Sequence, residues 1–243
     1  MAGILYVVAT PIGNWEDLTF RAARVLREVR WIACEDPNAT APLLTQYEIS
    51  TPLTSYHDAN KEEKAAALIA ILQEGQDIAL VSDAGTPVIF DPGAFLVAEA
   101  IASGVRVAPI PGASAPMAAA SVSGVRTDAL IIDGALPVRR LARERYFSAL
   151  RAEARTVVLL CQEEELCRTL ETLGKVMGRR RIALAGNLTR PDEECARGTA
   201  SELLAQIRRR PIHGDVTIVI EGRRRRRTGR LRDSRPLIRR VSE

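Results

Sequence analysis

The chain has 243 residues, 47% of them hydrophobic, so it can bury a large core as one large domain or two small ones. No uninterrupted apolar run is long enough to span a membrane and the first residues do not form a signal peptide, so we expect a cytoplasmic protein without a membrane partner. The formal net charge is +4, and the four cysteines lack the spacing of a zinc site or a disulfide framework.

The first half alternates short apolar strands with amphipathic helices. Such alternation is typical of an α/β unit with a parallel sheet. Strands are expected at residues 5–9, 31–34, 52–56, 78–81 and 105–108, and helices at 17–29, 41–47, 61–73 and 93–102. Asn60 with Glu63 predicts a capping box for the third helix, and Asp91 with Pro92 suits the start of the fourth.

The pattern changes after Gly112, where a helix rich in small residues is expected at 114–121. Strands follow at 129–133, 156–160, 181–185, 193–198 and 216–221, with helices at 138–150, 163–177 and 201–209. The sequence therefore predicts an N-terminal α/β lobe of residues 1–113, a C-terminal α/β lobe of residues 114–222 and an Arg-rich tail of residues 223–243.

Three loops rich in Gly and Pro follow apolar strands, at residues 10–14, 82–87 and 109–115. Ligands of open α/β sheets bind at the carboxyl ends of strands, so three such loops indicate one shared cleft. Gly85 would allow close backbone approach, and free N–H groups there could hold a carboxylate. Each loop, taken alone, is equally compatible with a simple connection.

Several common sites are excluded by their missing motifs: G-x-G-x-x-G, the Walker loop, the nucleophile elbow and H-E-x-x-H. With only two histidines, we expect no metal site. Arginine clusters at residues 139–145, 179–181, 208–210 and 223–227 keep nucleic acid among the possible partners. The tail alone is better explained as a solvated terminus without a partner.

Three ordered segments carry a resemblance to a known family. They are residues 5–14, residues 82–87 with 91–93, and residues 109–112 with Ser114 and Ala115. Together they resemble the small-subunit ribosomal RNA cytidine 2′-O-methyltransferase family of the tetrapyrrole methylase superfamily. The resemblance covers residues 5–222 and implies a two-lobed α/β fold with a parallel sheet in the first lobe and a mixed sheet in the second. It also implies S-adenosyl-L-methionine bound between the lobes, and a homodimer.

The resemblance also implies which residues bind the cofactor. In the first lobe and the connection these are Pro11, Ser82, Asp83, Ala84, Gly85, Pro87, Ser114 and Ala115. In the second lobe, Cys161 and Leu188 match positions that contact the adenosine part, although Cys161 is also compatible with an inert buried thiol.

Methyl transfer to a ribose hydroxyl would be helped by a general base, because that hydroxyl is a poor nucleophile. Glu35, Asp36 and His57 follow strand ends of the first lobe and are the candidates for this base. Asp36 beside Pro37 is equally well explained as a helix cap, and a single histidine such as His57 can be purely structural.

The chain departs from the family at segments expected to face the substrate. Where the family has Thr-Arg-Arg after Glu-Asp, this chain has Pro-Asn-Ala at residues 37–39, and where the family has Gly-Phe-Leu-Pro, it has Gly-Ala-Leu-Pro at 134–137. The family's Ser-Pro-His-Arg is replaced by Gln-Glu-Glu-Glu at 162–165, and its Arg-Glu-Leu-Thr-Lys by Ala-Gly-Asn-Leu-Thr-Arg at 185–190.

Three hypotheses follow. The first is a methyltransferase of small-subunit ribosomal RNA, the second a methyltransferase of a tetrapyrrole, a peptide or another small molecule, and the third a catalytically silent RNA-binding protein.

Overall fold

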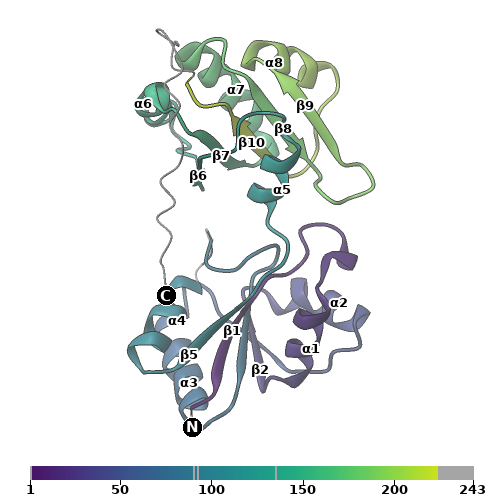
Figure 1. The fold of residues 1–243 in the computed structure, drawn as a ribbon, viewed down its shortest axis with the longest axis vertical. Helices are drawn as coiled ribbons and strands as arrows, with labels where there is room; N and C mark the ends of the chain where they lie inside the picture. The colour runs from purple at the N-terminus through teal and green to yellow at the C-terminus, as the bar shows by residue number, and fades with distance from the viewer. Residues whose placement is uncertain (1, 90, 92, 135, 224–243) are drawn as a thin grey trace, which may run out of the picture.

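The structure is a computed structural model that describes residues 2–89, 91, 93–134 and 136–223. It contains two five-stranded sheets, formed by consecutive parts of the chain (Figure 1). We call the part from β1 to β5 the first lobe and the part from α5 to β10 the second lobe. The two sheets agree with the predicted parallel and mixed types, and the boundary at residue 113 remains a prediction.

The first sheet is parallel throughout, with the strand order β3-β2-β4-β1-β5. Its strands are β1 (Ile4–Val8), β2 (Trp31–Cys34), β3 (Leu53–Ser55), β4 (Ile78–Val81) and β5 (Arg106–Ile110). The helices are the short 3-10 turn η1 (Trp15–Asp17) and α1 (Phe20–Glu28), α2 (Pro37–Gln46), α3 (Lys61–Gln73) and α4 (Gly93–Ala102).

Both faces of this sheet are covered, which explains why its strands are apolar at nearly every position. Successive side chains point to opposite faces, so Ala79 and Val81 pack in the cluster that contains α1, while Ile78 and Leu80 pack against α3 and α4. Because all five strands are parallel, their carboxyl ends lie at one edge of the sheet.

The second sheet is mixed, with the strand order β6-β7-β10-β8-β9. Its strands are β6 (Leu130–Asp133), β7 (Thr156–Cys161), β8 (Ile182–Gly186), β9 (Glu194–Gly198) and β10 (Val216–Ile220). The helices are α5 (Ala115–Val122), α6 (Arg140–Ala149), α7 (Glu163–Met177) and α8 (Ala200–Arg209), with a 3-10 turn η2 (Leu150–Ala152). Strand β10 lies between β7 and β8 and is antiparallel to both, so its amino end lies at the edge where those strands end.

Helices α6, α7 and α8 contribute to one core cluster of this lobe, with Phe147 and Leu159 fully buried in it. Helix α5 packs on the other face, over Val158 and Val219. Of the described residues, no helix combines the length and the apolar character needed to cross a membrane.

Three local expectations differ from the structure. The first helix begins at Phe20 after the Thr19 cap, not at residue 17. Helix α2 begins at Pro37, four residues before the expected start, because Asp36 caps it and proline fits its first turn. Asn60 makes no capping hydrogen bond to α3, because its side chain binds the Ser55 carbonyl and the backbone N–H of His57 instead.

Candidate functional site

A cavity of about 710 Å³ lies between the two lobes. Ile12 and Ala84 of the first lobe line it together with Ala115, at the start of α5, and further residues of the second lobe. From the second lobe the lining residues are Gly134, Leu136, Val138, Leu160, Cys161, Gln162, Glu165, Asn187, Leu188, Arg190, Gly214, Asp215, Val216 and Thr217. The volume lies within the range of small-molecule sites, which is about 300 to 1,000 Å³.

The loop after β4 is fixed by its pairing with the loop after β1. Thr10 and Gly85 exchange both backbone hydrogen bonds, at 2.8 Å and 3.1 Å between nitrogen and oxygen. Gly85 has φ +87°, and a Cβ there would lie 3.3 Å from Cγ2 of Ile12, which lines the cavity. The Gly85 N–H is therefore not free to hold a carboxylate, contrary to our expectation, and its conformation instead places Ala84 at the cavity.

A contact between the two lobes lies beside the cavity. The backbone N–H of Asn14 donates to Oγ1 of Thr189 at 3.0 Å. A Cβ on Gly13 would lie 2.6 Å from the carbonyl oxygen of Leu188, so this approach requires glycine. Thr189 has φ +67°, which is strained for a β-branched residue, and its N–H donates to Oε2 of Glu193 at 2.6 Å. Close backbone packing thus fixes the position of Leu188 in the cavity wall.

The ten residues expected to bind the cofactor divide into two groups. Ala84, Ala115, Cys161 and Leu188 line the cavity. The remaining six, which lie near the lining without forming part of it, are Pro11, Ser82, Asp83, Gly85, Pro87 and Ser114. Ser82 is buried and its hydroxyl donates to the Gly85 carbonyl, so it shapes the loop, whereas Asp83 is exposed. Contact with a cofactor remains a prediction for all ten residues.

Cys161 is a buried thiol at the end of β7. Burial raises its pKa to about 11, because a thiolate would be poorly solvated there. The residue is therefore a neutral part of the cavity wall rather than a nucleophile at neutral pH.

The three candidate bases lie on the first lobe, outside the cavity lining. Burial raises the pKa of Glu35, and the nearby carboxylates of Asp83 and Asp91 raise it further. Asp36 accepts a hydrogen bond of 2.8 Å from the N–H of Asn38, which is the capping role weighed above. His57 is half-buried, and its Nε2 lies 3.2 Å from Nδ2 of Asn60. The role of a base remains a prediction for all three.

Most of the second-lobe lining was not found from the sequence. Residues 214–217 lie at the amino end of β10, whereas the sequence predicts ligand contacts at the carboxyl ends of strands. The antiparallel direction of β10 brings its amino end to the cavity, and the only local signal was Gly214, which has φ +78°.

The wall formed by Leu136 and Val138 is held by Arg143, which lies buried behind it. Its guanidinium donates to the carbonyls of residues 137 and 138, at 2.9 Å and 3.2 Å, and pairs with Glu165.

Comparison with known proteins identifies the family. The profile described as Tetrapyrrole (Corrin/Porphyrin) Methylases matches residues 4–204. The chain belongs to this family. It is therefore a methyltransferase, as the resemblance of the three loops implies, and the hypothesis of a catalytically silent protein is not supported.

Among curated proteins, the chain is 43% identical to Ribosomal RNA small subunit methyltransferase I of Micromonospora olivasterospora, over 91% of this chain and 71% of that protein. It is 38% identical to the protein of the same name from Thermotoga maritima, over 91% of this chain and 99% of the relative. The chain thus belongs with the proteins that carry this name.

Solved structures show the same fold at lower identity. Cobalt precorrin-4 methyltransferase superposes with a TM-score of 0.67 and 17% identity, over 90% of this chain and 94% of that structure. Uroporphyrin-III-C-methyltransferase from Thermus thermophilus gives 0.64 and 21%, again over 90% and 94%. These likenesses establish the two-lobed fold alone.

Proposed function

We propose that this methyltransferase uses S-adenosyl-L-methionine to methylate the 2′-hydroxyl of a cytidine in small-subunit ribosomal RNA. The observation that carries the proposal is the 43% identity, over 91% of the chain, to a relative named for small-subunit ribosomal RNA. Action on ribosomal RNA also supports a cytoplasmic location, and the family resemblance supports a homodimer.

The cavity suits the proposed cofactor in size and in chemistry. Leu160, Leu188 and Val216 offer apolar surface for a flat purine ring. The carboxyl group of Asp215 lies in the same lining, and the exposed Asp83 follows β4 next to Ala84, whereas the lining residue Glu165 is paired with Arg143 and Arg168. Carboxylates near the cavity favour a ligand that carries positive charge, as a sulfonium with an amino acid group does.

S-adenosyl-L-methionine supplies a methyl group already activated by its sulfonium. The chain has to align the acceptor oxygen with that methyl and keep water out of the cavity. Among the candidate bases, Glu35 is best suited to accept the hydroxyl proton on its carboxylate, because its raised pKa makes it a stronger base than an ordinary glutamate.

A titration and a transfer assay test the proposal together. Calorimetry should show binding of S-adenosyl-L-methionine, and Asp83→Ala should weaken it about ten-fold, because a carboxylate near the cationic ligand is lost. The matched control is Asp58→Ala, which removes another exposed carboxylate of the first lobe without adjoining a lining residue. Equal affinity in the two variants would remove Asp83 from the site.

Transfer of labelled methyl to small ribosomal subunits that lack the modification identifies the acceptor. The label should be recovered in 2′-O-methylcytidine, with the adjoining phosphodiester resistant to alkali because the free 2′-hydroxyl is gone. Binding of the donor with no transfer to these subunits would overturn the proposed acceptor and favour a small-molecule acceptor instead.

A further inference from the structure

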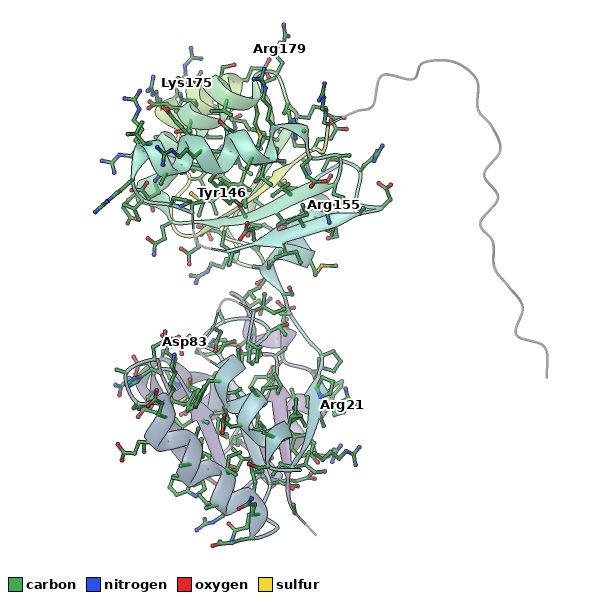
Figure 2. All side chains as sticks on the ribbon, turned by 90° about the vertical axis from the view of Figure 1, so that its left-hand side faces the viewer. Arg21, Asp83, Tyr146, Arg155, Lys175 and Arg179 are labelled. Atoms are coloured by element: carbon green, nitrogen blue, oxygen red, sulfur yellow. The ribbon has the colours of Figure 1, made fainter. Side chains whose placement is uncertain are left out.

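Charge is distributed unequally between the parts of the chain. Residues 1–113 contain 7 Lys and Arg against 14 Asp and Glu, which gives a formal charge of −7. Residues 114–222 contain 17 against 14, or +3, and residues 223–243 contain 10 against 2, or +8. A polyanion is therefore repelled by the first lobe as a whole and attracted by the rest of the chain. Figure 2 labels Arg155 and Arg179 on the second lobe and Asp83 on the first.

Six arginines gather at one end of the second sheet, a group that we call the basic edge. Its members are Arg151, Arg155, Arg179, Arg180, Arg181 and Arg223. Only Glu153 and Glu221 oppose them among the residues of these same three segments (151–155, 179–181 and 221–223), which leaves a formal excess of four positive charges.

Hydrogen bonds to backbone carbonyls show that these three segments contact one another. The guanidinium of Arg180 donates to the carbonyls of Glu153 and Glu221, at 3.5 Å and 3.4 Å, and also to that of Arg151. The N–H of Arg223 donates to the Glu153 carbonyl at 2.6 Å. The hydrogen bonds of Arg180 thus hold together the three segments that carry the other arginines.

Most members of the basic edge are exposed and available to a partner. Arg151, Arg179 and Arg181 are exposed, and their side chains make no hydrogen bond or ion pair within the described part of the chain. Arg155 pairs with Glu153 at 2.9 Å but remains 54% exposed. Exposed guanidinium groups on segments that contact one another form the kind of surface that binds phosphates.

The basic edge lies at the opposite end of the strands from the cavity. Strand β7 begins at Thr156, beside Arg155, and ends at Cys161 in the cavity wall. Strand β8 likewise runs from Ile182, beside Arg181, to Gly186, which precedes the lining residue Asn187. Five or six strand residues span roughly 15 to 20 Å.

We propose that the basic edge is a docking surface for the phosphate backbone of the RNA substrate, at a distance from the nucleotide that is methylated. The inference rests on the proposed function, since it takes RNA to be the acceptor. With roughly 3.4 Å per charge along one strand, the separation corresponds to about five nucleotides beyond the target. In the sequence, Arg223 is followed by Arg224–Arg227, which lie outside the described residues.

The test removes two exposed charges from the basic edge in the variant Arg179→Gln with Arg181→Gln. The matched control is Arg21→Gln with Arg106→Gln, which removes two exposed arginines of the first lobe. The measurement is filter binding of small-subunit ribosomal RNA to the full chain at several salt concentrations. The first variant should bind RNA at least about ten-fold more weakly. The slope of its log K against log salt concentration should become shallower by about 1.4 to 1.8, because two phosphate contacts are lost. The control should match the unmodified chain.

Kinetics and donor binding separate docking from a general defect. The basic-edge variant should raise the KM for small ribosomal subunits about ten-fold, leave kcat within about two-fold, and bind S-adenosyl-L-methionine with unchanged affinity. The penalty should disappear for RNA that extends fewer than about five nucleotides beyond the target, since such RNA cannot reach the basic edge.

The outcomes distinguish this inference from the proposed function. If the unmodified chain methylates small subunits while the two double variants bind RNA equally, docking at the basic edge is wrong and the proposed function stands. If the chain binds RNA through the basic edge but transfers no methyl, the proposed function fails, and the basic edge binds RNA without serving a substrate. If the unmodified chain binds no RNA, both are overturned.

Discussion

At the scale of single residues, Glu35 combines a possible catalytic role with a cost to stability. Its pKa is raised by burial first and then by Asp83 and Asp91, so the folded state disfavours the charged form. A carboxyl group whose pKa is raised on folding destabilises the protein above that pKa, and the effect disappears as the pH falls below its unfolded value.

We expect Glu35→Gln to raise the melting temperature at pH 7 to 8 and to change it little near pH 3. If Glu35 is the base, the same variant should lower kcat by about 10² to 10⁴ fold. The control is Glu16→Gln, which removes another exposed carboxyl of the same lobe, one that is not among the carboxylates that act on Glu35. Thermal scans and methyl transfer rates provide the two measurements. A variant that is stabilised but fully active would show that Glu35 is not the base.

The sequence could locate this site only in part, for a physical reason visible at Gly85. Gly and Pro after a strand identify a loop, and Ala84, Ala115, Cys161 and Leu188 do line the cavity. Whether an N–H in that loop is free depends on its partner, and Gly85 pairs with Thr10, 75 residues away in the chain. Local patterns carry no information about such long-range pairing.

At the scale of elements, α6 is anchored by the buried Arg143. Its side chain is 2% exposed and binds Glu165 as well as two carbonyls of the segment before the helix. We expect Arg143→Met to lower the free energy of unfolding by about 3 kcal/mol, because those acceptors lose their donor. Arg145→Met, which removes an exposed arginine of the same helix, should change it by less than about 0.5 kcal/mol. Urea unfolding of both variants makes the comparison, and equal stability would contradict the anchoring role.

Elements with strong local signals were predicted best. Helices α3 and α7 have the bounds expected from their sequences. The start of α2 was misplaced because residues 37–40 lack the apolar spacing of a helix. Asn60 shows the opposite error. A side chain that can cap a helix can also bind a neighbouring turn, and Asn60 binds the backbone N–H and lies beside the ring of His57 in place of capping α3.

At the scale of the whole molecule, the two lobes have separate cores and differ in charge. The position of one lobe relative to the other therefore depends on the residues that connect them and on those that meet at the cavity. Residues 111–114 connect β5 to α5, and Pro111 and Gly112 are exposed. The cavity takes Ile12 and Ala84 from one side of this connection and Cys161 and Leu188 from the other. A ligand that fills the cavity must therefore contact both lobes at once, and each contact opposes their separation.

We expect S-adenosyl-L-methionine to stabilise the chain and to protect this connection. At one hundred times its Kd, a ligand specific for the folded state raises the free energy of unfolding by about 2.7 kcal/mol. Cleavage by a protease of broad specificity between Ile110 and Ala115 should slow in proportion to occupancy, because the bound ligand restricts separation of the lobes. Asp83→Ala at the same donor concentration should be protected less, while Asp58→Ala should behave like the unmodified chain. If calorimetry shows a saturated site while the connection is cut at its original rate, the donor occupies one lobe only, and the cavity between the lobes is not its binding site.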